Sequence, residues 1–203
     1  MLSIAIQAGG GSRRMGQDKA LMPFLGKALI QRVVERLAPA ADELIVTTNN
    51  PEAYHFLGLP LFEDLLPGHG ALGGLYTALA CASHPVVAVV ACDMPFANAG
   101  LLTFAHNQLL HEDVDVVIPR TGEGYEPLHA LYRRETCLPA IRDAIAAEKW
   151  KVIAWFPQVK VKMLSADALE SLDPAGLAFW NLNTPQEFAT AEAIARQAEQ
   201  GEL

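Results

Sequence analysis

The sequence has few cysteines, and none of them lies in a metal-binding or redox arrangement. Cys81, Cys92 and Cys137 are the only cysteines of the 203-residue chain, and no two of them form a CxxC pair. An odd number of scattered thiols is typical of a reduced, cytoplasmic protein rather than a secreted one. Neither these cysteines nor the six histidines have the spacing of zinc ligands.

Long hydrophobic runs and an excess of positive charge are also missing. No stretch approaches the roughly 20 apolar residues of a membrane span. The first apolar run, residues 2–8, is short and lacks a basic leader, so we expect no secretory signal and no membrane partner. The net charge of −8 argues against nucleic acid as a partner, because nucleic-acid binders normally carry a basic footprint.

Three familiar site motifs are absent as well. The chain has no GxxxxGK[ST] loop and no GxSxG elbow. The dinucleotide-binding pattern GxGxxG fails too, because Arg14 stands where its third glycine would follow Gly9 and Gly11. These absences remove the P-loop NTPases, the dinucleotide-binding proteins and the α/β-hydrolases from consideration.

What the sequence does contain is an alternation of apolar strand and helix patterns. The periodicity predicts strands at 2–6, 43–48, 59–62, 85–92, 114–118, 128–132, 158–164 and 179–182. Helices are expected at 28–37, 72–82, 98–110, 135–147 and from 185 onward, with a short one after Pro51. This order predicts an α/β domain with a mostly parallel sheet, and no linker or repeat divides the chain.

The stretch QAGGGSRRMGQDKA, residues 7–20, follows the first predicted strand directly. Ligands of open α/β sheets bind beyond the carboxyl ends of the strands. Glycines let backbone N–H groups face an anion, and Arg13, Arg14 and Lys19 add positive charge. Residues 1–40 hold six Lys or Arg against two Asp or Glu, a basic island in an acidic chain that suits a compact anion. The alternative is a tight turn with solvated charges.

Four stretches together resemble the molybdenum cofactor guanylyltransferase family of nucleotidyltransferases. They are AGGGSRRMGQDK (8–19), EDLLPGHGALGG (63–74), ACDMPF (91–96) and NLNTPQEF (181–188), which match in order and spacing over nearly the whole chain. The resemblance implies a three-layer α/β/α Rossmann-like nucleotidyltransferase fold with a mixed, mostly parallel sheet. It implies a single domain, 1–203, in which 1–120 bind the nucleotide and 121–203 supply the acceptor-binding half and a closing helix.

The resemblance also implies roles for particular residues. Nucleotide contacts are expected from Ala8, Gly9, Gly10, Lys19, Asn49, Asp64 and Asp93. Asp93 is expected to hold Mg²⁺, with Asn183 as a second ligand or a hydrogen-bonding partner. The residues also allow other interpretations: Asp93 as a helix N-cap, Asn183 as a cap or Asx-turn before Thr184, and Asp64 as a solvated loop carboxylate.

The implied reaction is the transfer of GMP from GTP to the terminal phosphate of molybdopterin, with or without molybdenum, with release of pyrophosphate. Arg13, Lys19 and Asp93 are the expected catalytic residues, and Arg14 is assigned the same charge-neutralising role as Arg13. Gly9-Gly10 favours GTP, because related cytidylyltransferases open with AAG rather than AGG. Alternatives are CTP, a different phosphorylated acceptor such as a sugar phosphate, or a regulatory module without turnover. Proteins that deliver or receive the cofactor are candidate partners.

The chain departs from the family pattern at two positions and carries further polar and aromatic candidates. Gln7 replaces a usual leucine and Ala71 a usual proline, which bears on base and sugar recognition rather than on phosphate. Acceptor contacts could come from His69, from His129 with Arg133 and Arg134, or from Trp150, Trp155 and Phe156 stacking on a pterin. For the aromatic residues core packing is the favoured interpretation, and for the arginines a paired surface patch is an equal alternative.

Overall fold

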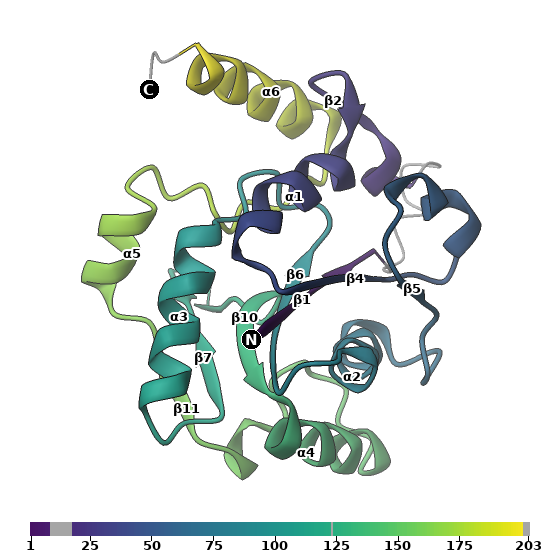
Figure 1. Cartoon of the computed structure of the whole chain (residues 1–203), viewed down its shortest axis with the longest axis vertical. Helices are drawn as coiled ribbons and strands as arrows, with labels where there is room; N and C mark the ends of the chain where they lie inside the picture. The colour runs from purple at the N-terminus through teal and green to yellow at the C-terminus, as the bar shows by residue number, and fades with distance from the viewer. Residues whose placement is uncertain (9–17, 123, 201–203) are drawn as a thin grey trace.

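The computed structural model describes residues 1–8, 18–122 and 124–200, and Figure 1 shows their arrangement. The predictions on Gly9, Gly10, Arg13 and Arg14 therefore concern residues outside the described part of the chain. None of the helices in that part is long and apolar enough to cross a membrane.

A seven-stranded sheet forms the centre of the molecule, in the order β11-β7-β10-β6-β1-β4-β5. Its strands are β1 Leu2–Gln7, β4 Glu43–Thr47, β5 Leu61–Phe62, β6 Val86–Ala91, β7 Val116–Ile118, β10 His129–Arg133 and β11 Val161–Met163. β10 runs antiparallel to β6 and β7, and the other neighbours in this sheet are parallel. Every residue of β1 and β6 is buried, as expected for central strands that are covered on both faces.

Helices cover both faces of this sheet, as Figure 1 shows. On one face lie α1 Leu29–Leu37 and α3 Ala99–His111, with the short α5 Ala166–Leu172 beside α3. On the other face lie α2 Gly70–Cys81 and α4 Arg134–Ala146. Alternate residues of β1 point to opposite sides, so Ile4 and Ile6 join the first core and Ala5 joins the second. The expected three-layer α/β/α fold with a mixed, mostly parallel sheet is confirmed.

A third, smaller core attaches the end of the described chain to its beginning. α6 Pro185–Glu199 begins with a capping box between Thr184 and Glu187. Phe188 on its apolar face shares one small core with Phe24, which belongs to the hairpin formed by β2 Pro23–Phe24 and β3 Lys27–Ala28. In Figure 1 this helix lies beside β2 and above α1.

Most predicted elements are confirmed to within a few residues, but the strand predicted at 179–182 is wrong. This segment is irregular because it turns, with Trp180 N–H bonded to Leu177 O, and then crosses the end of the sheet. Leu182 is buried there without pairing as a strand, and its N–H donates to Asp93 O at 3.0 Å. Elements not predicted include α5, which has no buried residue, the hairpin of β2 with β3, and the hairpin of β8 Arg120–Thr121 with β9 Gly124–Tyr125. Short 3₁₀ turns complete the fold: η2 Lys19–Leu21, η3 Ala38–Ala40, η4 Pro51–Leu57 and η5 Phe156–Gln158.

Candidate active site

The predicted nucleotide residues follow four neighbouring strands at one edge of the sheet. Asp93, Ala8, Asn49 and Asp64 come after β6, β1, β4 and β5, and this is also the spatial order of those strands. The ladder continues past the strand ends, since Cys92 N–H bonds Gln7 O at 3.1 Å and Ala8 N–H bonds Thr47 O at 2.8 Å. Four strands at their usual spacing span about 15 Å, so the four residues line an edge of nucleotide-like length.

Lys19, Asp93 and Asn183 converge at the β6 end of this edge. The Lys19 ammonium donates to Asn183 Oδ1 at 2.8 Å and lies 3.7 Å from Asp93 Oδ2. The Lys19 and Asp93 side chains are only 16% and 22% exposed. The backbone N–H of Leu182 is bonded to the Asp93 carbonyl, and this bond holds the neighbouring Asn183 close to Asp93. Residues from three distant parts of the chain, each taken from a different motif, thus meet at one place.

The Asp93 carboxylate is under-compensated in its surroundings. Burial raises its pKa above the usual aspartate value, and the positive charge of Lys19 lowers it only in part. A desolvated carboxylate whose pKa stays raised beside one ammonium group has capacity for a second positive charge. Among the residues that the structure describes, no group of three or more His, Cys, Asp or Glu side chains could hold a metal ion. Asp93 therefore fits a cation that takes most of its ligands from substrate phosphates and water, as Mg²⁺ does.

Other side chains cap the helices that follow Asp93 and Asn183. Asn98, not Asp93, is the N-cap of α3, because its side chain accepts the Leu101 N–H at 3.1 Å. Thr184, not Asn183, caps α6. Asn183 Oδ1 accepts from Lys19, and the Asn183 amide donates to Asn181 O at 3.2 Å. The role of Asn183 as a metal ligand stays a prediction.

Lys19 is held in place by two residues to which the sequence analysis gave no role. Asp18 caps the η2 turn by accepting the Ala20 N–H at 3.1 Å. The hydroxyl of the buried Tyr54 donates to the other Asp18 oxygen at 2.5 Å. Burial raises the pKa of Tyr54, so its phenol stays protonated and remains a donor. The Asp18-Lys19 pair of the opening motif was a signal for Asp18, whereas no local pattern points to Tyr54.

Asn49 and Asp64 form a reciprocal pair at the β5 end of the edge. The Asn49 amide donates to Asp64 Oδ2 at 3.0 Å, and the Asp64 backbone N–H donates to Asn49 Oδ1 at 3.2 Å. Asp64 is thus an oriented carboxylate rather than a freely solvated one. The pair offers acceptor oxygens to the hydroxyl and amine donors of a ligand. Their contact with a nucleotide stays a prediction.

Gln7, the departure from the family pattern, is packed against the start of α2. A Cβ added at Gly74 would lie 2.1 Å from Gln7 Nε2, so the glycine makes room for the glutamine side chain. The same amide lies 3.5 Å from the Ala71 carbonyl, while Gln7 Oε1 is buried without a hydrogen-bond partner in the described chain. Position 7 therefore couples the end of β1 to the loop that contains position 71.

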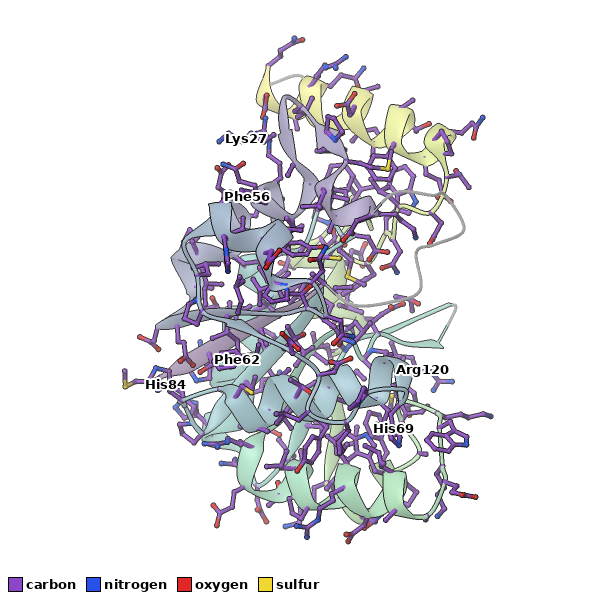
Figure 2. All side chains as sticks on the ribbon, turned by 90° about the vertical axis from the view of Figure 1, so that its right-hand side faces the viewer. Lys27, Phe56, Phe62, His69, His84 and Arg120 are labelled. Atoms are coloured by element: carbon purple, nitrogen blue, oxygen red, sulfur yellow. The ribbon has the colours of Figure 1, made fainter. Side chains whose placement is uncertain are left out.

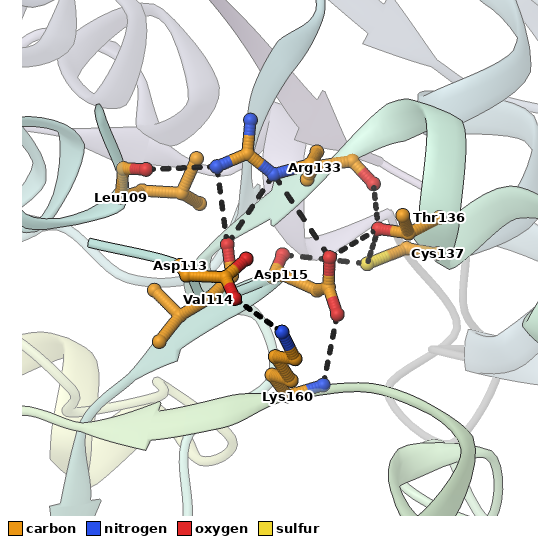
Figure 3. Close-up of polar contacts among 8 residues, drawn as sticks. All are labelled: Leu109, Asp113, Val114, Asp115, Arg133, Thr136, Cys137 and Lys160. Atoms are coloured by element: carbon orange, nitrogen blue, oxygen red, sulfur yellow. Dashed lines mark hydrogen bonds and ion pairs between the residues drawn. The ribbon is translucent and has the colours of Figure 1, made fainter. Parts of the chain in front are cut away.

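The two arginines suggested for acceptor binding lie at the opposite edge of the sheet. Arg133 pairs with Val86 at the start of β6, and its guanidinium donates to Leu109 O at 2.9 Å and Val114 O at 3.2 Å (Figure 3). Arg134 donates to Ala80 O at 3.1 Å. Both arginines are engaged in holding elements together, which corrects their assignment to the acceptor phosphate.

The aromatic candidates divide into core and surface. Trp155 is fully buried and its indole donates to Val152 O, which confirms the core interpretation for this residue. Trp150 is 56% exposed, and its ring centroid lies 5.2 Å from that of His69. The exposed Trp150 ring thus lies beside the half-buried His69 at the start of α2, the helix whose first turn contacts Gln7.

Lys19 is partly buried beside Asp93, a carboxylate that can accept more positive charge. This pair suits a ligand that brings both negative charge and a divalent cation. A nucleoside triphosphate with its metal has both properties. The position beyond the carboxyl ends of parallel strands is where such folds bind nucleotides. The class of protein that this fold and this edge define is therefore an enzyme that acts on a nucleotide phosphate.

Comparison with known proteins narrows this class to one family. Residues 4–160 match the model of the MobA-like NTP transferase domain, which is more than half of the chain. The chain belongs to this family and is a nucleotidyltransferase.

Individual relatives agree with this assignment. The chain is 38% identical over 98% of its length to a probable molybdenum cofactor guanylyltransferase of Pelotomaculum thermopropionicum, of which it covers 95%. It is 33% identical over 93% of its length to a molybdenum cofactor guanylyltransferase of Desulfosudis oleivorans, also covered to 93%. The crystal structure of molybdopterin-guanine dinucleotide biosynthesis protein A from Archaeoglobus fulgidus superposes with a TM-score of 0.82 at 26% identity, covering 96% of this chain and 99% of that one.

Proposed function

We propose that this chain transfers GMP from GTP to the terminal phosphate of molybdopterin, giving the guanine dinucleotide form of the cofactor and pyrophosphate. The observation that carries the proposal is the convergence of Lys19, Asp93 and Asn183 at one end of the strand edge. The names of the relatives support the choice of guanine and of molybdopterin.

The strand order supports a direction for the bound nucleotide. The positive charge of Lys19 and the carboxylate of Asp93 stand at the β6 end, and Asn49 with Asp64 stand at the β5 end. We place the phosphates at the first end and the ribose or base at the second, with Ala8 between them. Ala8, Gly9 and Gly10 would contact the nucleotide through their backbone, in a stretch that begins at the end of β1.

The chemistry needs no nucleophile from the protein, because the acceptor phosphate is already anionic at neutral pH. An oxygen of that phosphate attacks the α-phosphorus of GTP, and the bond from this phosphorus to the bridging oxygen breaks as pyrophosphate leaves. The main obstacle is repulsion between two anions, so positioning and charge neutralisation supply most of the catalysis. Lys19 would offset the charge that builds on pyrophosphate, and we assign Arg13 and Arg14 the same task from their place in the opening motif.

Asp93 would hold Mg²⁺ together with phosphate oxygens. When bound there, the ion would neutralise charge on the phosphates and polarise the α-phosphorus. Asn183 would keep the Lys19 ammonium aligned and could share its oxygen with the metal shell.

The two halves of the chain would bind different substrates, although both halves contribute strands to one sheet. Residues 1–120 would bind the nucleotide and residues 121–203 the acceptor, which must approach from the β10 side of Asp93. β10 lies between β6 and β7, so the two halves would form a single domain, 1–203, that cannot separate. The free cysteines of the described chain favour a reducing compartment, the cytoplasm, for this reaction.

Measuring pyrophosphate release from crossed pairs of substrates tests the proposal. GTP, CTP and ATP would each be offered with molybdopterin and with sugar phosphates in the presence of Mg²⁺. We expect release with GTP and molybdopterin together, and none from GTP alone. Preference for CTP or for a sugar phosphate would identify the protein as a related transferase. Nucleotide binding without release of pyrophosphate would identify a regulatory module.

A further inference from the structure

His129 is a buried polar side chain at the catalytic edge for which the proposed reaction has no direct use. It is the first residue of β10, it is 1% exposed, and it pairs with Val90 near the end of β6. Its Nε2 accepts the backbone N–H of Asn98 at 3.0 Å. Because Nε2 is the acceptor, the ring proton lies on Nδ1, which has no hydrogen-bond partner among the described residues.

The hydrogen bond from Asn98 fixes the end of the segment that carries Asp93. This segment starts at Cys92, whose N–H is bonded to Gln7 O at 3.1 Å, and its middle turn is closed by Ala97 N–H on Met94 O. Asn98 then caps α3 and donates to Leu172 O of α5 at 2.7 Å. The Asp93 segment is therefore held at both ends: Cys92 is bonded to the end of β1, and the Asn98 N–H is bonded to the His129 ring.

The same ring also contacts the segment that carries Asn183. Phe179 meets the His129 ring edge to face, with centroids 5.1 Å apart and planes at 85°. Three residues later Leu182 donates its N–H to the Asp93 carbonyl, and Asn183 Oδ1 accepts a hydrogen bond from the Lys19 ammonium. One imidazole thus touches both segments whose ends bring Asp93 and Asn183 to Lys19.

We propose that His129 is a positioning residue of the active site, which sets the Asp93 and Asn183 segments relative to each other without touching substrate or metal. The inference rests on the proposed function. An apolar side chain of similar size would fill the space but leave the Asn98 N–H buried without an acceptor. Burial lowers the pKa of His129 to about 4, so at neutral pH the ring keeps the lone pair that this N–H needs.

Three variants separate positioning from plain stability. His129→Leu removes the acceptor and keeps the volume, and His129→Gln offers a carbonyl oxygen that can replace Nε2. Tyr132→Phe is the matched control: it lies on the same strand, is fully buried, and loses one hydrogen bond, from its hydroxyl to Pro127 O at 2.6 Å. Its ring packs in the core on the other face of the sheet, away from the Asp93 segment.

The readouts are kcat, KM for GTP, the free energy of unfolding in urea, and Mn²⁺ binding in the presence of GTP. We expect kcat of His129→Leu to fall on the order of 10- to 100-fold, as for a small displacement of reacting groups. Its Mn²⁺ affinity should fall as well, while KM for GTP stays within about twofold because the phosphate and base contacts remain. His129→Gln should recover a large part of kcat. Tyr132→Phe should lose stability and keep kcat.

The inference is overturned if folded His129→Leu keeps wild-type kcat and Mn²⁺ affinity, or if Tyr132→Phe loses kcat to the same extent. Should His129→Leu not fold, Phe179→Leu removes the ring contact between His129 and the Asn183 segment and carries the same comparison with Tyr132→Phe. Unchanged kcat and Mn²⁺ affinity in folded Phe179→Leu would then overturn the inference. Absence of pyrophosphate release in the wild type would contradict the proposed function instead. In that case the Mn²⁺ measurement, which needs no acceptor, still tests His129.

Discussion

The two edges of the central sheet treat their polar groups in opposite ways. At the edge where the parallel strands begin, Glu43 accepts hydrogen bonds from Ser3 and from both the N–H and hydroxyl of Ser83. Burial alone would raise its pKa, but these hydrogen bonds hold the pKa of Glu43 below its usual value. At the edge where the strands end, the pKa of Asp93 is raised, because desolvation is not matched by enough donors or positive charge.

Three of the six buried polar atoms without a partner in the described chain lie at the carboxyl edge. They are Gln7 Oε1, Thr47 Oγ1 and His129 Nδ1, whereas Arg32 Nε, His106 Nε2 and Gln108 Oε1 belong to α1 and α3. At the opposite edge Arg133, Asp115 and Lys160 join three strands in a closed network, which Figure 3 shows. Figure 2 separates the two edges, with His84 labelled at one side of the sheet and His69 with Arg120 at the other. The network at the amino edge is closed within the protein, whereas Gln7, Thr47 and His129 at the carboxyl edge keep unmet interactions.

The largest effect should come from the carboxylate that this comparison singles out. Asp93→Asn removes the negative charge that would hold the metal, and we expect kcat to fall on the order of 100-fold or more. The free energy of unfolding should be unchanged or raised, because a desolvated charge is lost. Lys19→Ala should lower turnover similarly. Steady-state pyrophosphate release at saturating GTP and Mg²⁺, with urea unfolding alongside, checks both. Turnover near wild type in these two variants would contradict a catalytic role for the carboxyl edge of the sheet.

The reverse pattern is expected at the other edge. Asp115 accepts the Thr136 hydroxyl at 2.8 Å and the Lys160 N–H at 2.9 Å, and its side chain is only 15% exposed. Asp115→Ala leaves these donors unpaired beside Arg133 and should lower the free energy of unfolding by about 3 kcal/mol. Its kcat, measured well below the unfolding transition, should equal that of the wild type. A large loss of kcat in a fully folded variant would show that the two edges are coupled.

The acid side of the stability profile sharpens the comparison at His129. The pKa of this histidine is lowered from 6.5 to about 4 by burial, so the unfolded chain binds its proton at a higher pH than the folded protein does. The stabilising contribution is therefore complete above pH 6.5 and is lost as the pH falls toward 4, by no more than about 3 kcal/mol. The difference in unfolding free energy between wild type and His129→Leu should shrink over this window. A difference that is constant from pH 7 to pH 4.5 would contradict a neutral buried ring.

The sequence predicted the sheet and the site edge well because each depends on local patterns. Apolar runs such as 85–92 are long enough to identify central strands, and motif residues such as Lys19 and Asp93 carry charge at recognisable positions. The strand predicted at 179–182 failed because a turn places Leu182 under Asp93, a contact between residues 89 positions apart. Tyr54 and His129 were not identified as supports because their partners, Asp18 and Asn98, are chosen by the fold and not by spacing along the chain.

The smallest effect concerns the acceptor. Trp150 is exposed beside His69, whereas Leu110 is equally exposed at the far end of α3, which makes Leu110→Ala a matched control for Trp150→Ala. If the indole stacks on the pterin, Trp150→Ala should raise KM for molybdopterin by roughly fivefold to tenfold, as expected for loss of one stacking contact, with KM for GTP unchanged. Trp150→Phe should retain most of the affinity. A rise in KM for GTP instead would move the ring to guanine, and equal KM values in Trp150→Ala and Leu110→Ala would leave the exposed tryptophan outside both substrate sites.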